Sequence, residues 1–294
     1  MKNKLFNIFR IGVLAVVLGC TGCSLSSKNK SDEKINEISE MKVTYIDVGK
    51  GDCILIEKDD TNILIDAGYY DTSEKVTNYL QEEGIDNLDY FIMTHYDKDH
   101  VGGAATIASA FSIGKIFLPN YEGSSKYYRE LMNVISMNSL DAENVSEDIS
   151  FTLSGVNYTI SASDVTYVAG DGDEEGNDND VSLVMTADYG NDTYLFAGDI
   201  EKEGINCYLE ADHGQFDVIK MPHHGRKAGN TDDLIDDVQP EIAIITDSSE
   251  DSADNKVLNL LEDADVITYQ TSVCGSITVT GTGSGTYHVE VENP

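Results

Sequence analysis

Two histidines and two aspartates follow a single apolar run of the sequence. The run spans residues 90–93 and has the length and composition of a buried strand. It is followed at once by His95, Asp97, Asp99 and His100. Zinc and manganese favour such a mixture of nitrogen and oxygen ligands. If the chain turns into a helix after Asp97, the first two side chains face one way and the last two another, so this loop can serve one or two metal ions.

The distribution of histidine strengthens this interpretation. An acidic turn alone is common in a chain with 53 Asp and Glu residues, but the chain has only 6 histidines. A second pair, His223 and His224, also follows an apolar run, residues 216–221, and Asp199 follows a third run. Enzymes that alternate strands and helices assemble their sites at the carboxyl ends of strands, so we expect these side chains to meet.

Composition limits the partners of the chain. With 294 residues and 40% hydrophobic content, the chain can bury one sizeable core. Its formal net charge is −34. Binding to nucleic acid rests on Lys and Arg that neutralise phosphates, so DNA is a disfavoured partner, although a bound cation would offset the charge locally. No protein partner is predicted from the composition.

The N-terminus has the pattern of a targeting segment. Three basic residues precede an apolar stretch, residues 11–18, which is too short for a permanent membrane span. Cys20 follows in the context of a bacterial lipoprotein signal, and Cys23 is a second candidate for lipid attachment. We therefore predict a lipoprotein signal over 1–23, a flexible polar tether over 24–40, and a lipid anchor on the extracytoplasmic face of a bacterial cell membrane. The alternative is plain secretion.

The remainder of the chain alternates short strands with helices, which predicts an α/β fold. Strands are also expected around Gly155, over residues 149–168, and an acidic solvated loop over residues 171–180. Hydrophobic periodicity, glycines and capping residues predict helices over 73–83, 104–110, 126–137, 200–210, 231–238 and 255–263. Further strands are predicted over 43–48, 53–57, 62–65, 115–118, 182–187, 193–196, 241–246, 266–271, 276–280 and 286–291.

Several motifs in order identify a family. They include YIDVGKGDCILI, THYDKDHVGG, YLFAGDIEKEG, VIKMPHHG and GSITVT. With these motifs the chain resembles the metallo-β-lactamase-fold hydrolases, and most closely the nuclease-like domain of ComEC-type competence proteins, from Val43 to about Val289. The resemblance implies one domain over residues 41–294 with the four-layer αββα sandwich of that fold.

The resemblance also implies roles for the polar residues. His95 and Asp97 would hold a first metal ion, and Asp99 and His100 a second. The Asp199 carboxylate would bridge the two ions.

The HisHisGly turn would complete this site. His224, directly before a glycine, would be the last ligand of the second metal, and His223 would face the substrate as proton donor or phosphate contact, although the two can exchange roles. Asp99 and His223 are thus the predicted catalytic residues. Asp66 would support the metal loop through hydrogen bonds. Arg226 stands where the family pattern has a small hydroxyl residue, and we predict that it contacts the substrate.

The family's intermediate histidine ligand is missing. No histidine lies between His100 and His213, and Asn179 and Ser182 occupy that neighbourhood. The first site should therefore be weak and rich in oxygen ligands, so we expect one or two Zn²⁺ or Mn²⁺ ions per chain.

The predicted function is an extracytoplasmic, membrane-anchored, metal-dependent hydrolase that uses a metal-activated water, with a phosphodiester or another ester as substrate. A nuclease-like phosphodiesterase leads. One alternative is a cell-wall phosphorylcholine-type esterase, in which Tyr69, Tyr70 and Tyr96 offer aromatic faces to a cationic head group, unless they only pack. The other alternative is a non-catalytic surface protein that binds a metal or a ligand.

Overall fold

The computed structural model describes residues 39–170, 176–211 and 213–294. The predicted signal segment with Cys20 and Cys23, the predicted tether up to residue 38 and part of the acidic loop lie outside the described residues. Everything below concerns the described ranges, in which no helix is both long and apolar enough to cross a membrane.

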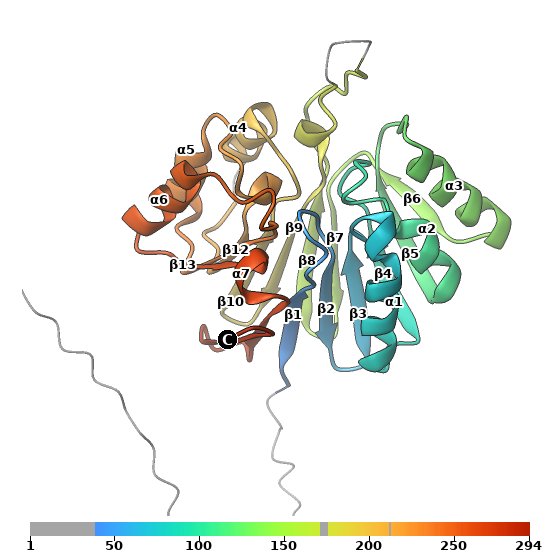
Figure 1. Cartoon of the computed structure of the whole chain (residues 1–294), viewed down its shortest axis with the longest axis horizontal. Helices are drawn as coiled ribbons and strands as arrows, with labels where there is room; N and C mark the ends of the chain where they lie inside the picture. The colour runs from blue at the N-terminus through green and yellow to red at the C-terminus, as the bar shows by residue number, and fades with distance from the viewer. Residues whose placement is uncertain (1–38, 171–175, 212) are drawn as a thin grey trace, which may run out of the picture. The chain divides into compact units, whose positions relative to one another are not determined.

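Two mixed sheets form the centre of the domain (Figure 1). The first, sheet A, has the strand order β15-β14-β1-β2-β3-β4-β5-β6. Its strands are β1 (Met41–Tyr45), β2 (Ile54–Lys58), β3 (Thr61–Ile65), β4 (Asn87–Ile92), β5 (Ser112–Pro119), β6 (Ala142–Val145), β14 (Ile277–Gly281) and β15 (Tyr287–Val291).

The second, sheet B, has the order β13-β12-β11-β10-β9-β8-β7. Its strands are β7 (Ile149–Leu153), β8 (Val156–Ser161), β9 (Val184–Tyr189), β10 (Asp192–Phe196), β11 (Val218–Lys220), β12 (Ile242–Ile245) and β13 (Ile267–Gln270).

Helices cover the outer face of each sheet. On sheet A lie α1 (Ser73–Glu82), α2 (Ala104–Ala110) and α3 (Lys126–Asn138), and on sheet B lie α4 (Lys202–Glu210), α5 (Thr231–Val238) and α6 (Asn255–Asp263), as Figure 1 shows. A short helix, α7 (Thr271–Cys274), joins β13 to β14.

Three apolar cores hold these four layers together. The middle core packs the facing sides of the two sheets, with Tyr45 and Ile54 from sheet A against Tyr194 and Phe196 from sheet B. The outer cores pack each sheet against its own helices. Since each sheet buries both faces at its centre, a central strand such as β12 reads as a continuous apolar run. The predicted four-layer αββα sandwich in a single domain is confirmed.

The direction of the strands creates one polar edge. Strands β3 and β4 are parallel neighbours in sheet A, and β10, β11 and β12 are parallel neighbours in sheet B. The residues that follow these strands include Asp66, His95, Asp199, His224 and Thr246. Carboxyl ends of parallel strands meet at the same edge, so the two halves of the chain bring their polar side chains to one place.

One strand and one α-helix were not predicted, and one strand prediction extended too far. Strand β6 has a single buried residue, Val145, so its sequence carries almost no strand signal. Helix α7 is one turn long. The strands around Gly155 end at Ser161, and residues 162–168 are irregular. Edge strands and single turns depend on tertiary contacts more than on local pattern.

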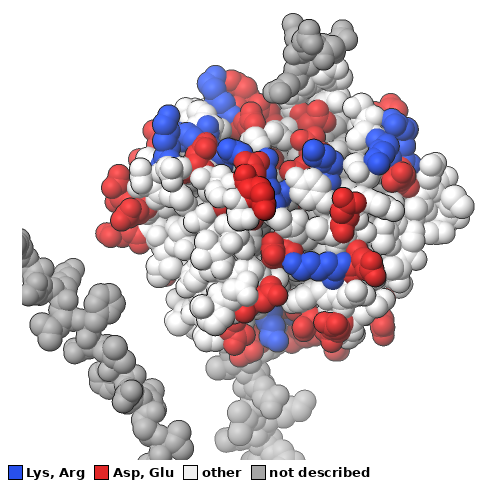
Figure 2. All heavy atoms as spheres, viewed as in Figure 1, with Lys and Arg blue, Asp and Glu red and all other residues white. Residues whose placement is uncertain are grey.

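The surface is acidic but mixed. Figure 2 shows Asp and Glu spread over the visible face with Lys and Arg interspersed among them. That face therefore has no continuous basic stripe of the kind that follows a nucleic-acid backbone.

Candidate metal centre

The loop after β4 closes in one helical turn. The amides of His100 and Val101 donate to the carbonyl oxygen of Asp97 at 3.0 and 2.8 Å. The turn directs His95 and His100 inward, where both are fully buried, while the Asp97 side chain remains 51% exposed. The turn brings the rings of His95 and His100 to 4.0 Å of each other, whereas the sequence had grouped His95 with Asp97 and His100 with Asp99.

Gly102 lets this loop pack against neighbouring backbone. A Cβ atom at this position would lie 2.3 Å from the carbonyl oxygen of Lys98 and 2.6 Å from the amide nitrogen of Tyr70. We expect Gly102→Ala to lower the free energy of unfolding by about 3 kcal/mol, because backbone atoms cannot move aside as side chains do. Gly214→Ala is the control, since no atom lies within 4 Å of its added Cβ. Equal denaturation midpoints for the two variants would contradict this prediction.

Four of the predicted ligands converge at the polar edge, and we call them the cluster: Asp99, His100, Asp199 and His224. The Oδ2 atom of Asp199 lies 3.0 Å from Nε2 of His224 and 3.2 Å from Nε2 of His100. The two Nε2 atoms are 3.4 Å apart, and Oδ2 of Asp99 is 3.6 Å from Nε2 of His224. Atoms of Asp99, His100 and His224 fall within 4.8 Å of one another, as do atoms of His95, His100 and Asp199. These are the donor types and the spacing of a divalent cation site.

Hydrogen bonds fix the imidazoles with Nε2 toward the centre. Nδ1 of His100 lies 2.8 Å from Oδ2 of Asp66, which also accepts from the Thr94 hydroxyl at 2.7 Å. That hydroxyl has one proton, so its oxygen is left to accept from Nδ1 of His95 at 3.1 Å. Asp66 is therefore placed to support the loop as predicted, beneath the ligands.

His224 is held in the same way from sheet B. Its Nδ1 lies 3.1 Å from the Thr246 hydroxyl, which donates to Oδ1 of Asp52 at 2.6 Å. A hydroxyl that donates its only proton must accept at its oxygen, so His224 carries a proton on Nδ1 and points Nε2 toward Asp199.

One ring nitrogen of His95 has no hydrogen-bond partner among the described residues. This atom, Nε2, is buried, and Oδ2 of Asp97 lies 3.9 Å away. Burial lowers the pKa of His95 to about 3, and His100 adds to this effect, so the imidazole is neutral. A buried nitrogen lone pair without a partner costs free energy, and a metal ion at this point would remove that cost. The residues present fit a bound cation.

Buried carboxylates also attract positive charge to this cluster. Burial lowers the pKa of His224, but the negative charge of Asp199 outweighs this effect. Together with hydrogen bonds to Asp199, Asp52 and Asp99, that charge raises the pKa of His224 to about 10. Burial and the neighbouring Asp99 raise the pKa of Asp97 to about 6. A divalent cation satisfies the same carboxylates that otherwise hold protons on the histidines.

The neighbouring His223 faces a different group. Its Nδ1 lies 2.9 Å from Oε1 of Glu201, which also accepts from the side-chain amide of Asn179 at 3.1 Å. His223 and His224 have φ of 46° and 52°, which is the left-handed region. Two adjacent side chains in that region cost of order 1–3 kcal/mol each and persist where the surroundings impose them. The strained turn separates the two histidines, with His224 in the cluster and His223 outside it.

The other predicted positions lie around the cluster. Ser182 accepts from the Asp199 amide at 3.3 Å, and the buried Oδ1 of Asn179 has no partner among the described residues. The Arg226 guanidinium pairs with Asp251 and Asp254, so its predicted contact with substrate would require those pairs to open.

Sequence reasoning missed Lys220. It is fully buried at the end of β11, and its Nζ lies 2.5 Å from Oδ2 of Asp52 and 3.1 Å from Oδ1 of Asp199. The available signal was a lysine directly after Val218 and Ile219, inside the apolar run of residues 216–221. Such a charge in a central strand needs a buried partner.

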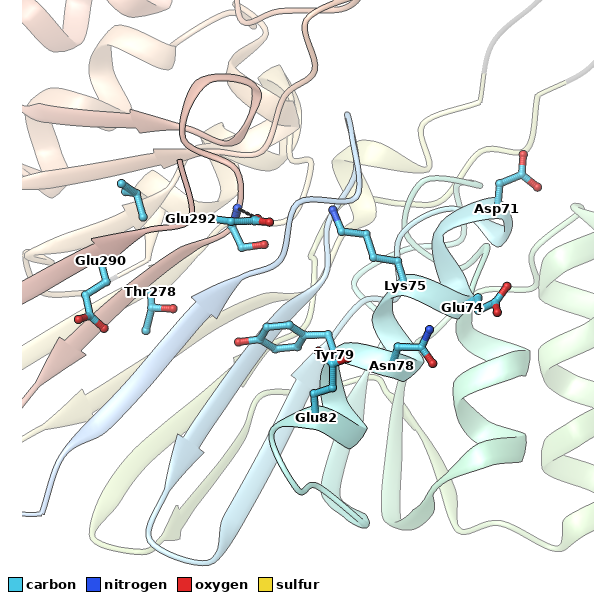
Figure 3. A pocket seen from close by; sticks show the side chains of 11 residues that line it. Asp71, Glu74, Lys75, Asn78, Tyr79, Glu82, Thr278, Glu290 and Glu292 are labelled. Carbon is cyan, nitrogen blue, oxygen red and sulfur yellow. Dashed lines mark hydrogen bonds between the residues drawn. The ribbon is translucent and has the colours of Figure 1, made fainter. Parts of the chain in front are cut away.

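A separate pocket lies away from this cluster. Figure 3 shows it between α1 and strands β14 and β15, with Lys75 and Tyr79 on one side and Glu290 and Glu292 on the other. Its volume is about 810 Å³, and none of the predicted ligands lines it.

Comparison with known proteins agrees with this fold. Residues 46–245 match the model of the metallo-beta-lactamase superfamily. Recombination protein 2 of Haemophilus influenzae is 28% identical over 252 residues, which cover 84% of this chain and 28% of that protein. ComE operon protein 3 of Bacillus subtilis is 24% identical over 261 residues, which cover 81% of this chain and 33% of that protein. The chain thus spans about a third of the length of these relatives.

Solved structures share the fold at low identity. The metallo-beta-lactamase fold protein YhfI from Bacillus subtilis matches with a TM-score of 0.53 and 12% identity, over 83% of this chain and all of that one. CmlA, a diiron β-hydroxylase from Streptomyces venezuelae, matches with a TM-score of 0.53 and 12% identity, over 81% of this chain and 53% of its own. The predicted family resemblance is confirmed, and the chain belongs to the metallo-β-lactamase superfamily.

Proposed function

We propose that this protein is a metal-dependent phosphodiesterase that acts outside the cytoplasm from a lipid anchor. The observation that carries the proposal is the Oδ2 atom of Asp199 between the Nε2 atoms of His100 and His224. When bound there, Zn²⁺ or Mn²⁺ supplies a water of lowered pKa and a positive charge for phosphate oxygens. The fold alone does not select hydrolysis, since CmlA is a β-hydroxylase with a similar fold.

The residues of the site would have three different roles. Asp99, His100, His224 and Asp199 would hold the cation most firmly, because they supply four donors to one point. His95 and Asp97 would hold a second cation weakly, or none, since the exposed Asp97 lies 3.9 Å from the imidazole. His223, at the partly exposed side of the cluster, would donate a proton to a substrate oxygen.

The two alternatives make different demands on the structure. A choline esterase would use aromatic faces near the site. Tyr96 is buried against Tyr121 and Tyr128, so the partly buried Tyr69 and the exposed Tyr70 would have to supply them. A non-catalytic binding protein would have no use for Glu201 beside His223. DNA as substrate requires local neutralisation of an acidic surface, which a bound cation supplies only at the reacting phosphate.

The test is hydrolysis of bis(p-nitrophenyl) phosphate by the purified full chain with added Mn²⁺ or Zn²⁺. We expect turnover that EDTA abolishes and that excess metal restores. Metal binding without turnover on this ester, on phosphorylcholine esters or on DNA would favour the binding protein. A failure to bind either metal would overturn the proposal.

Replacing Glu201 tests the role of His223. We expect Glu201→Gln to lower kcat roughly 10- to 100-fold with little change in metal affinity, because the imidazole loses the carboxylate that orients it. Glu203→Gln is the matched control, since Glu203 lies two residues further on, in the first turn of α4, and pairs with the exposed Lys202. Equal kcat values for the two variants would remove His223 from the mechanism.

A further inference from the structure

The ammonium group of Lys220 is enclosed by three oxygen atoms. Its Nζ donates to the carbonyl oxygen of Gly198 at 2.8 Å, in addition to its contacts with Asp52 at 2.5 Å and Asp199 at 3.1 Å. An ammonium group has three protons, so each proton has one acceptor. The residue is fully buried, and no water is needed to satisfy it.

This arrangement fixes the orientation of the Asp199 carboxylate. Oδ1 is occupied by Lys220, and Oδ2 is the atom that faces His100 and His224. A free carboxylate rotates and offers either oxygen or both. With Oδ1 held, the carboxylate offers a single oxygen in a single direction.

The same ammonium group is also connected to His224 by a chain of hydrogen bonds, which is a second path to the metal centre. Lys220 binds Oδ2 of Asp52, whose Oδ1 accepts from Thr246, and Thr246 in turn accepts from Nδ1 of His224. The two paths end on the outer atoms of the same imidazole–carboxylate pair, Nδ1 of His224 and Oδ1 of Asp199, whose inner atoms Nε2 and Oδ2 lie 3.0 Å apart.

We propose that Lys220 is a positioning residue of the metal centre. It holds Asp199 as a one-oxygen ligand and sets the orientation of His224, and both effects prepare the site for one firmly bound divalent cation. The inference rests on the proposed function only in that the cluster binds a metal.

The sign of the effect separates this role from that of a simple countercharge. A lysine that only balanced charge would repel a divalent cation, so its removal would strengthen metal binding. A lysine that positions two ligands has the opposite effect, since its removal leaves Asp199 and Asp52 free to turn away or to pair with the histidines. Metal affinity measured apart from activity therefore decides between the two roles.

The experiment is a calorimetric titration of Mn²⁺ into the full chain carrying Lys220→Met. We expect the affinity for the first equivalent of Mn²⁺ to fall at least about 10-fold, the range known for residues that orient metal ligands. Lys58→Met is the matched control, because Lys58 is also buried in a strand but contacts Ser39 and Asp59, far from the ligands.

A second variant keeps the experiment decisive if Lys220→Met does not fold. Lys220→Met removes the ammonium that balances two buried carboxylates, whereas Lys220→Met combined with Asp52→Asn keeps the buried net charge unchanged. We expect the double variant to fold and still to bind Mn²⁺ at least about 10-fold more weakly. Should neither variant fold, Thr246→Val removes the second path without exposing a charge, and the same loss is expected.

The outcomes separate this inference from the proposed function. Wild-type protein that binds no Mn²⁺ would overturn both. Wild-type protein that binds Mn²⁺, with folded Lys220 variants that bind it equally or more tightly, would overturn the positioning role alone.

Discussion

Replacing Asp199 by asparagine is expected to reduce phosphodiester hydrolysis by roughly 10⁴-fold. The carboxylate supplies the one atom that lies within 3.2 Å of both buried Nε2 atoms, and an amide of the same shape lacks its charge. A metal ion contributes several kcal/mol to stabilising a transition state, and each 1.4 kcal/mol is a factor of ten in rate. Steady-state kinetics with saturating Mn²⁺ measures the loss.

Matched substitutions keep this prediction specific. Asp188→Asn changes an exposed carboxylate on the neighbouring strand β9 and should leave the rate unchanged. His100→Ala should match Asp199→Asn, while His288→Ala, at an exposed position, should not. Turnover by Asp199→Asn within tenfold of wild type would place the chemistry elsewhere.

Metal ions are expected to stabilise the fold strongly. A ligand present at about 1,000 times its Kd stabilises the native state by about 4.1 kcal/mol. For a domain of this size that corresponds to a rise of about 10 °C in Tm. The physical cause is the set of buried carboxylates, which lie close together around His100 with Lys220 as the one buried ammonium beside them.

Thermal unfolding in EDTA and in added Mn²⁺ or Zn²⁺ measures this shift. Asp199→Asn should unfold at the same temperature in both conditions, because it lacks the shared ligand. A shift of equal size in the variant would mean that the ions act at other acidic groups of the surface, and this would count against the site.

Local pattern predicted most of the fold. Helices α2, α5 and α6 begin and end as expected from their apolar spacing and flanking residues. Strand β6 was missed because it lies at a sheet edge, and its pairing with β5 supplies the order that its own residues do not encode.

The ligands were predictable because they interrupt apolar runs. His95 and His224 each follow a strand, and strand ends at one edge of a parallel sheet meet in space. The residues that hold these ligands in place were harder to predict. Lys220 and Asp52 are separated by most of the chain, and neither residue carries a local sign of the other. The structure shows Asp52 buried between Lys220 and Thr246.

The centre has a further consequence for how the protein matures. Its ligands come from both halves of the chain, with His100 and His224 separated by 124 residues. During synthesis the N-terminal half emerges first with only part of the donor set, so a cation cannot be captured in its final geometry until the second sheet has docked. A metal ion held at this centre would therefore be acquired late in biogenesis, from the compartment in which the chain completes its folding.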